Sequence, residues 1–449
     1  MSTEKLFTDF KSVSLEQWLE KLKAELKGNL SALISVPERD IELPAELHLV
    51  QSPTESAARN LRRKTTDWKI AAEFDTVPSN NERILSALEG GVNALSLSFT
   101  NQKDFDKASK GVQFEYISAG LKFSDFTSAR NFNNPGNIKM IFDPVSLNAA
   151  SGKWIHDSGH LVELFTSRPN EVCLFVSGQI YGSAGSTSTT ELACSLSHLN
   201  EYIHLLHSAE EDLQKVFGKI VISMSCSDNY FLGIAKFRAM RELVNLLFSA
   251  YDIQTDEPFE IVGRTNELFY CKNDRYNNLL RQTAQCMSAV LGGCDELIVV
   301  PFDQSDEVVR MARNIQLILK EESYFDKVSD AGGGAYAIEH LTDQLIQNAW
   351  KQFLEIEKSG GLIQAVQGNQ VQQKIVVERS ELIAELLKNE KTLIGVNKFR
   401  NPMEKWQDVE ISETISGKEF EPLETANLEQ LTGKILTAKY AREAQSAQR

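Results

Sequence analysis

The residues best placed to do chemistry lie in a glycine-rich turn at positions 176–199, VSGQIYGSAGSTSTTELACSLSHL. An apolar run leads into this turn and a helical pattern leaves it. Such turns between a strand and a helix hold phosphate groups or carry catalytic residues, although the turn is equally open to a purely structural role. No lysine follows the glycines, which excludes a P-loop. Ser188 and Glu191 have the spacing of a capping box for the following helix.

Two further stretches could bind ligands. His156 and His160 in WIHDSGH are spaced so that they could hold a metal on a helix, but the intervening Asp-Ser-Gly is typical of a loop and disfavours a metal site. The glycines of DAGGG, at positions 330–334, could bind phosphate at the start of the next helix or form a structural turn.

Four cationic or hydroxyl residues complete the candidates. Arg264 and Thr265 end the apolar run IVGRT, which is where barrel enzymes place functional residues, so they could be remnants of a substrate pocket. Arg310 and Arg313 lie in a helical pattern, and we expect them to form ion pairs there.

Composition restricts the function classes. The chain has 449 residues and a formal net charge of −15, which disfavours nucleic-acid binding because that needs a basic footprint. No apolar run is long enough to cross a membrane and the first residues show no signal-peptide core, so we expect a cytoplasmic protein with no membrane partner. The six cysteines form no metal-binding spacing, and we expect them to be buried reduced thiols.

The elements that must position these residues alternate between strands and helices. Apolar runs that are not alternating in polarity indicate strands covered on both faces, and helical patterns separate most of them, which favours a parallel sheet. Eight such runs match a (β/α)8 barrel of the TIM type. An open doubly wound sheet is the alternative, but the chain has no G-x-G-x-x-G after the first run. The predicted strands are WKIAAEF, ALSLSF, FEYISAGLKF, IKMIFD, EVCLFVSG, KIVISMS, FEIVGRT and ELIVVPF.

The flanking segments suggest an arm and a tail. Residues 1–45 are predicted to be an N-terminal arm with an amphipathic helix that begins at the capping box Ser14–Gln17 and stops at Gly28. Its apolar face must be buried on its own domain or on a partner, and we expect docking on a partner subunit. That face consists of Leu15, Trp18, Leu19, Leu22 and Leu26.

We expect the barrel to span residues 46–395 and a polar tail to span residues 396–449, ending in a frayed terminus. Within the barrel region, residues 334–360 are predicted to form one long helix or a helix pair. Residues 374–396 are predicted to add a helix and a strand.

Three blocks of sequence resemble the adenosylcobalamin-dependent acyl-CoA mutases, above all the methylmalonyl-CoA mutases. The resemblance covers about residues 45–390, and the last block is the most specific. The blocks are IAKFRAMRELV (234–244), YNNLLRQTAQCMSAVLGGCDELIVVPFD (276–303) and ARNIQLILKEESYFDKVSDAGGGAYAIEHLTDQLIQNAWKQFLEIEKSGG (312–361).

The resemblance implies a barrel that threads the CoA tail along its axis, and a separate flavodoxin-like domain whose Asp-x-His-x-x-Gly motif ligates cobalt. None of the seven histidines here has Asp two residues before it, and only about fifty residues follow the barrel. We therefore expect no flavodoxin-like cobalamin domain and no cofactor or metal bound by this chain.

The barrel motifs of the active relatives are also altered. Where they have Trp-x-Ile-Arg-Gln-Tyr, this chain has WKIAAE, so Ala71 replaces the arginine that serves CoA and Glu73 replaces the tyrosine at the rearranging group. Where they have Ser-Gly-Tyr-His, this chain has SGQI, so Ile180 replaces a histidine that donates to the thioester. Isoleucine cannot stabilise charge on that oxygen. We expect no catalytic residues here.

These departures resemble the small, non-catalytic subunit that bacterial members of the family pair with a catalytic large subunit. The expected holoenzyme is a heterodimer that interconverts succinyl-CoA and methylmalonyl-CoA, with adenosylcobalamin on the large subunit; the isolated chain could form homodimers. Two alternatives remain. The chain could be a catalytic barrel that works with a cobalamin domain on another chain, or a scaffold or ligand-binding protein outside mutase biology.

Overall fold

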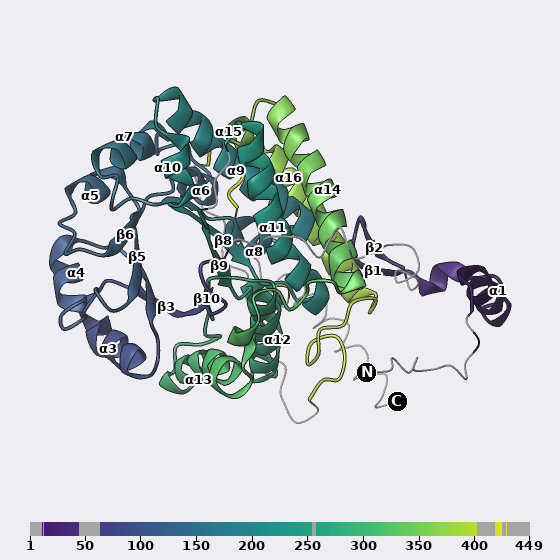
Figure 1. Cartoon of the computed structure of the whole chain (residues 1–449). Coiled ribbons are helices and arrows are strands. Elements are labelled where there is room, and N and C mark those ends of the chain that lie inside the picture. The colour runs from purple at the N-terminus through teal and green to yellow at the C-terminus, as the bar shows by residue number, and fades with distance from the viewer. Residues whose placement is uncertain are drawn as a thin grey trace, which may run out of the picture.

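A computed structural model describes residues 11, 13–44, 63–253, 257–401, 418–423 and 428 (Figure 1). Its centre is a sheet of eight parallel strands in the order β6-β5-β4-β3-β10-β9-β8-β7. A parallel bridge between Met140 and Val172 joins the two edge strands and closes the sheet into a barrel. The predicted (β/α)8 architecture is confirmed.

All eight predicted strands form, and their apolar residues are buried as expected for strands covered on both faces. The third is shorter than its apolar run because residues 114–117 form a turn before it. The strands are β3 (Lys69–Asp75), β4 (Ala94–Ser98), β5 (Ser118–Lys122), β6 (Ile138–Ile141), β7 (Leu174–Val176), β8 (Ile220–Ser225), β9 (Glu260–Arg264) and β10 (Glu296–Ile298).

Helices follow the strands around the outside of the barrel (Figure 1). The segment after β5, which reads as a loop, contains only the short helix α5. The helices are α3 (Asn81–Glu89), α4 (Gln102–Ala108), α5 (Phe126–Asn131), α6 (Pro144–Ser151), α7 (Gly159–Ser167), α8 (Gln179–Ser183), α9 (Ser188–Ser208), α10 (Leu213–Phe217), α11 (Tyr230–Ala250), α12 (Asn277–Leu291) and α13 (Asp306–Leu317). A turn of π-helix, Ile318–Glu322, continues α13.

An additional layer of helices covers α9 and α11. Residues 334–360 form the single helix α14 (Tyr336–Lys358), which packs on both of these helices, and α15 (Leu362–Gln367) and α16 (Gln370–Leu387) follow it (Figure 1). The strand predicted near residue 392 is wrong, because Ile394 makes only an isolated bridge to Lys398.

Buried ion pairs hold these helices together and explain the positive charges of the AKFRAMRE block. Arg238, which is fully buried, donates from Nη2 to Asp330 at 3.0 Å and to Glu339 at 2.6 Å, linking α11 to the start of α14. Gly334 N–H donates to the same Glu339 carboxylate at 3.0 Å. The DAGGG turn is therefore tied to protein carboxylates rather than being open for a phosphate.

The N-terminal arm consists of a helix and a hairpin. Helix α1 (Leu15–Glu25) begins with the predicted Ser14–Gln17 capping box, and Gly28 follows it with φ +85°. Strands β1 (Ser35–Glu38) and β2 (Ile41–Leu43) then form an antiparallel hairpin beside α14, with Ile41 fully buried. In Figure 1 the hairpin lies against the barrel body, whereas α1 stands apart from it.

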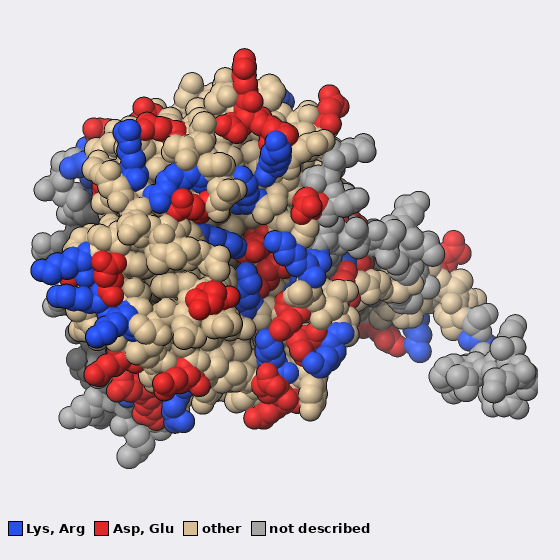
Figure 2. Space-filling view, turned by 60° about the vertical axis from the view of Figure 1, so that its left-hand side comes forward, with Lys and Arg blue, Asp and Glu red and all other residues tan. Residues whose placement is uncertain are grey.

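Two global expectations can be compared with this structure. No described helix is both long enough and apolar enough to cross a bilayer. On the face shown in Figure 2, basic and acidic side chains are interspersed, so that face offers no continuous basic field for a nucleic acid.

Candidate functional site

The mouth of the barrel, at the carboxyl ends of its strands, contains an ion-pair network centred on Glu73. The Glu73 carboxylate accepts from Lys122 Nζ at 2.9 Å and from Arg264 Nε at 3.0 Å, while Arg264 Nη1 also donates to Glu267 at 3.0 Å. Burial alone would raise the pKa of Glu73, but Lys122 and Arg264 outweigh it and lower the pKa to about 2. Glu73 is therefore ionised at neutral pH, and each of its carboxylate oxygens accepts a hydrogen bond.

The other two altered family positions hold apolar side chains. Ala71 points into the barrel and is buried in a cluster of interior residues that includes Phe175 and Ile298. Ile180, on the short helix α8, is partly buried against the main core. Neither side chain has a polar atom, so neither can hydrogen-bond a thioester or a CoA phosphate.

The axis of the barrel is filled by its own side chains. Towards the amino ends of the strands, Lys139 Nζ donates to Glu260 at 2.6 Å, and Lys69 Nζ lies 3.4 Å from the same carboxylate. Phe175 fills the middle of the interior, where it is 4% exposed. The cavity that remains among these residues has a volume of about 30 Å³, which is room for a water molecule or two rather than for a pantetheine chain.

The glycine-rich stretch at 176–199 contains the end of strand β7, the one-turn helix α8 and the first part of α9. The predicted Ser188–Glu191 capping box is wrong: Thr187 is the N-cap, and its hydroxyl accepts from Thr190 N–H. Glu191 instead points into the protein, where it accepts from Ser225 N–H and Oγ, both at 2.6 Å, and from Lys236 Nζ at 2.8 Å. Glu191, which the sequence predicts to be part of a capping box, is instead the anion of a buried ion pair with Lys236.

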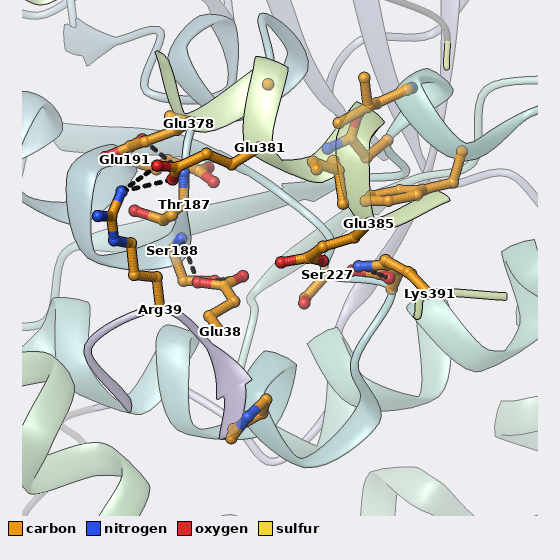
Figure 3. Close-up of a pocket in the computed structure, with 18 of the residues that line it drawn as sticks. Glu38, Arg39, Thr187, Ser188, Glu191, Ser227, Glu378, Glu381, Glu385 and Lys391 are labelled. Atoms are coloured by element: carbon orange, nitrogen blue, oxygen red, sulfur yellow. Dashed lines mark hydrogen bonds and ion pairs between the residues drawn. The ribbon is translucent and has the colours of Figure 1, made fainter. Parts of the chain in front are cut away.

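The first turn of α9 binds two carboxylates from distant segments of the chain (Figure 3). Glu38, in the arm hairpin, accepts from Ser188 N–H at 2.7 Å and from Ser188 Oγ at 2.9 Å. Glu378, on α16, accepts from Thr187 N–H at 2.9 Å. The amides at a helix start attract anions, and here the protein supplies its own.

A cleft of about 470 Å³ separates the hairpin from α16 beside this turn (Figure 3). Two ion pairs border it: Arg39 pairs with Glu381, and Lys391 Nζ lies 2.6 Å from Asp228. Burial raises the pKa of Glu38 to about 7, against the opposing hydrogen bonds from Ser188. Several further acidic side chains line the cleft, so it is unsuited to an anionic substrate.

The described histidines do not fit a cobalt ligand at the barrel mouth. His198 is fully buried and lies 3.0 Å from Asp143 Oδ1 through Nε2, with its Nδ1 3.3 Å from the Tyr181 hydroxyl. His160, in the first turn of α7, stacks on Phe126 at the start of α5. Among the described residues, no cluster of three or more histidine, cysteine, aspartate or glutamate side chains is arranged to hold a metal ion.

The structure confirms the prediction for the cysteines but not the prediction for Arg310 and Arg313. All six cysteines are buried and free, as predicted, and burial raises the pKa of the Cys173 thiol to about 12. The prediction of ion pairs for Arg310 and Arg313 is wrong: within the part of the chain that the structure describes, neither forms one. Arg313 Nη1 donates instead to the backbone carbonyl of Ser86 at 3.3 Å.

The predicted docking face of the arm is uncovered in the isolated chain. Helix α1 buries none of its residues. Its apolar side chains are only partly covered: Leu15, Trp18, Leu19, Leu22 and Leu26.

Fold and site together define a (β/α)8 barrel whose axis is filled by its own side chains. Residues 162–443, more than half of the chain, match the family model described as methylmalonyl-CoA mutase. The chain belongs to the methylmalonyl-CoA mutase family.

Several relatives are named methylmalonyl-CoA mutase small subunit. That of Porphyromonas gingivalis is 28% identical over 89% of this chain and 71% of its own length. That of Streptomyces virginiae is 28% identical over 74% of this chain and 58% of its own length. That of Propionibacterium freudenreichii is 26% identical over 76% of this chain and 53% of its own length. This chain thus spans less than two thirds of the last two relatives.

Among solved structures, the dihydropteroate synthase of Thermus thermophilus superposes over 59% of this chain and 96% of its own, with a TM-score of 0.35 and 12% identity. This likeness is too distant to bear on function.

Sequence reasoning missed the charged residues that make this site. Lys139, Glu260 and Lys236 lie inside or next to apolar runs, and a charge in such a run signals a buried ion pair. The identity of each partner, however, depends on strands and helices far apart in the sequence.

Proposed function

We propose that this chain is a non-catalytic small subunit of a two-chain methylmalonyl-CoA mutase. The observation that carries the proposal is the filled barrel axis, in which Lys139–Glu260 and Phe175 leave a cavity of only about 30 Å³. The names of the relatives support the same assignment. Residues 1–45 would then be the docking arm, residues 46–395 the barrel and residues 396–449 a polar tail.

Binding of an acyl-CoA along the axis would require several changes at once. The Lys139–Glu260 pair would have to separate, Phe175 would have to leave the interior, and the Glu73–Arg264 pair would have to open at the mouth. Each ion pair is at least partly buried, and removing one partner of such a pair leaves a charge without compensation. The fold therefore favours the closed axis.

The arm is the proposed contact with the large subunit. An amphipathic helix whose apolar face is only partly covered by the described part of its own chain gains free energy when a partner buries that face. Trp18, near the centre of α1, supplies the largest apolar side chain of this face and is the expected anchor. The same exposed face could support homodimers when the partner is absent.

Adenosylcobalamin would be held by the large subunit. Two described histidines have other contacts: His198 lies inside the core and His160 stacks on Phe126. The holoenzyme would interconvert succinyl-CoA and methylmalonyl-CoA on its partner chain, while this chain stabilises the assembly.

The test is co-purification with the large mutase subunit encoded by the same organism. We expect one heterodimeric species with cobalamin-dependent activity that the small chain alone lacks. The double variant W18A/L22A should weaken assembly, whereas K21A/K23A, on the exposed polar face of the same helix, should not. Because α1 buries nothing in the isolated chain, both variants should fold normally.

Two results would contradict the proposal. Turnover of an acyl-CoA by this chain with a separate cobalamin-binding chain would show a catalytic barrel. Failure to associate with any mutase chain would place the protein outside mutase biology.

A further inference from the structure

A second cleft, larger than the one beside the hairpin, opens at the side of the barrel mouth. It lies between helices α3 and α13, at the carboxyl ends of β3, β9 and β10, and has a volume of about 610 Å³. This is within the range of small-molecule sites. Its lining includes Ala71 and Val300, which belong to the interior cluster, together with Ala87 on α3 and Ala312 on α13, so the cleft extends sideways from the mouth towards these helices.

The cleft combines an apolar floor with arginines on both walls. Arg83 projects from α3 and Arg313 from α13, and Arg264 and Glu73 lie at its inner end. The floor is formed by small and branched apolar side chains, including Ala71, Ala72, Ala87, Val92, Val299, Val300, Val309 and Ala312.

The two arginines on the cleft walls keep unused hydrogen-bond donors, and no carboxylate of the described residues pairs with their positive charge. Arg83 Nη2 donates to Gln304 at 3.2 Å, and Arg313 Nη1 donates to the Ser86 carbonyl at 3.3 Å. Neither forms an ion pair with any residue in the described ranges. The Nε–H of Arg313 is buried and has no hydrogen-bond partner. A guanidinium has five donors, and a carboxylate or phosphate is its preferred acceptor.

One buried acceptor in the cleft also lacks a partner. Gln316, one turn after Arg313 on α13, is 1% exposed, lines the cleft, and its Oε1 accepts no hydrogen bond. An amide oxygen requires an N–H or O–H donor. A ligand that satisfies both Arg313 Nε–H and Gln316 Oε1 therefore carries an anionic group together with a hydroxyl or amine.

The acidic residues of the cleft do not cancel this preference. Glu73 and Glu267 are both bound by Arg264, and Lys122 neutralises Glu73 further. Asp75 lies exposed at the rim, where water screens it. The uncommitted charges facing the interior are those of Arg83 and Arg313, on a chain whose formal net charge is −15.

We propose that this cleft binds a small hydroxylated organic anion, with its phosphate or carboxylate group between Arg83 and Arg313 and a hydroxyl on Gln316 Oε1. The position agrees with a general property of the fold, because barrels of this type often hold phosphate groups in the loops after the seventh and eighth strands. Here those strands are β9 and β10, and the loops that follow them contribute Glu267, Pro301 and Gln304 to the cleft.

The full chain is titrated calorimetrically at low salt with ribose 5-phosphate, gluconate and ribose. We expect at least one anion to bind and ribose, which has hydroxyls but no charge, not to bind. Preference for ribose 5-phosphate would assign a phosphate head group, and preference for gluconate a carboxylate. The proposal is wrong if ribose binds as tightly as the anions. It is also wrong if neither anion binds with a Kd below about 10 mM.

Three substitutions locate the site. R83Q and R313Q should each weaken binding about tenfold or more, because each removes a charge-assisted contact, and R313K should retain part of the affinity. R310Q is the matched control: it makes the same change of charge on α13, at an exposed residue that does not line the cleft. Equal losses in R310Q and R313Q would reduce the effect to non-specific charge and overturn the proposal.

A further variant tests the geometry without changing any charge. A Cβ at Gly90 would lie 2.1 Å from Arg313 Nη1, so G90A must displace this guanidinium, and its backbone φ of −84° accepts alanine. We expect G90A to keep its circular dichroism spectrum and to lose affinity in parallel with R313Q. Unchanged affinity in a folded G90A protein would contradict the assigned place of Arg313.

Discussion

Glu73 on β3 and Arg264 on β9 are joined by a hydrogen bond of 3.0 Å that spans the end of the intervening strand β10. Lys122 reaches the same carboxylate from β5, two strands away on the other side. In a barrel, side chains from alternate strands meet in one layer, and this layer is a closed ion-pair network. Glu73, which the sequence resemblance places where active relatives are expected to have a tyrosine, is held in this network.

The first prediction concerns how the stability supplied by the Glu73 ion-pair network depends on acid pH. The folded pKa of Glu73, about 2, lies below its ordinary value of 4.5. The network therefore stabilises the fold above pH 4.5, and this contribution is lost as the pH falls towards 2. At neutral pH, E73Q should lower the free energy of unfolding by about 1–3 kcal/mol, since Arg264 and Lys122 lose their anion.

Urea unfolding of wild type and E73Q at pH 7, 5 and 3 measures this effect. The gap between the two proteins should narrow as the pH falls. E82Q, at an exposed residue of α3, provides the control and should follow the wild type throughout. A constant gap across this range would show that the carboxylate contributes no titratable stability.

The second prediction concerns Glu191 and Lys236, which are each 1% exposed and lie 2.8 Å apart. K236M should lower the free energy of unfolding by about 3–5 kcal/mol because it leaves Glu191 buried and uncompensated. The double variant E191Q/K236M should recover part of that loss. A double-mutant cycle measured by chemical denaturation gives the coupling, and additive effects of the two substitutions would contradict a direct pair.

The third prediction concerns the filled axis. F175A should lower the free energy of unfolding by about 3–5 kcal/mol, as expected when a buried aromatic side chain is removed and the barrel wall cannot collapse. It should not create affinity for CoA, because the Lys139–Glu260 pair still crosses the interior. Thermal melts and CoA titrations of wild type and F175A test both statements. CoA binding by wild type that neither R83Q nor R313Q weakens would refute the closed axis, because such binding would not be in the cleft beside the mouth.

Much of the architecture is readable from the sequence, and the reason is physical. Each barrel strand is buried on both faces, so it appears as a continuous apolar run, such as KIVISMS for β8 and ELIVVPF around β10. The capping box of α1 depends on residues three apart, so it too is local. Both of these features are encoded by neighbouring residues, and both were predicted correctly.

The site is less predictable because its contacts are long-range. Ser188 and Glu191 have the right spacing for a capping box, but Lys236 and Ser225 bind Glu191 more strongly than a helix end does, and Thr187 caps α9 instead. Glu38 reaches the same helix from 150 residues away. Such tertiary interactions override local propensity, and no pattern within a short window indicates them.

The last prediction concerns Glu38, which ties the arm hairpin to the start of α9. Its folded pKa, about 7, is raised above the ordinary 4.5. The neutral acid is therefore favoured in the folded state, so attachment of the hairpin is strongest below pH 4.5 and weakens as the pH rises through 7. Amide exchange in the hairpin, corrected for intrinsic rates, should accelerate between pH 5 and pH 7 in wild type but not in E38Q. E42Q, at an exposed residue of the same hairpin, should behave as wild type. If E38Q and wild type show the same pH dependence, Glu38 does not control this attachment.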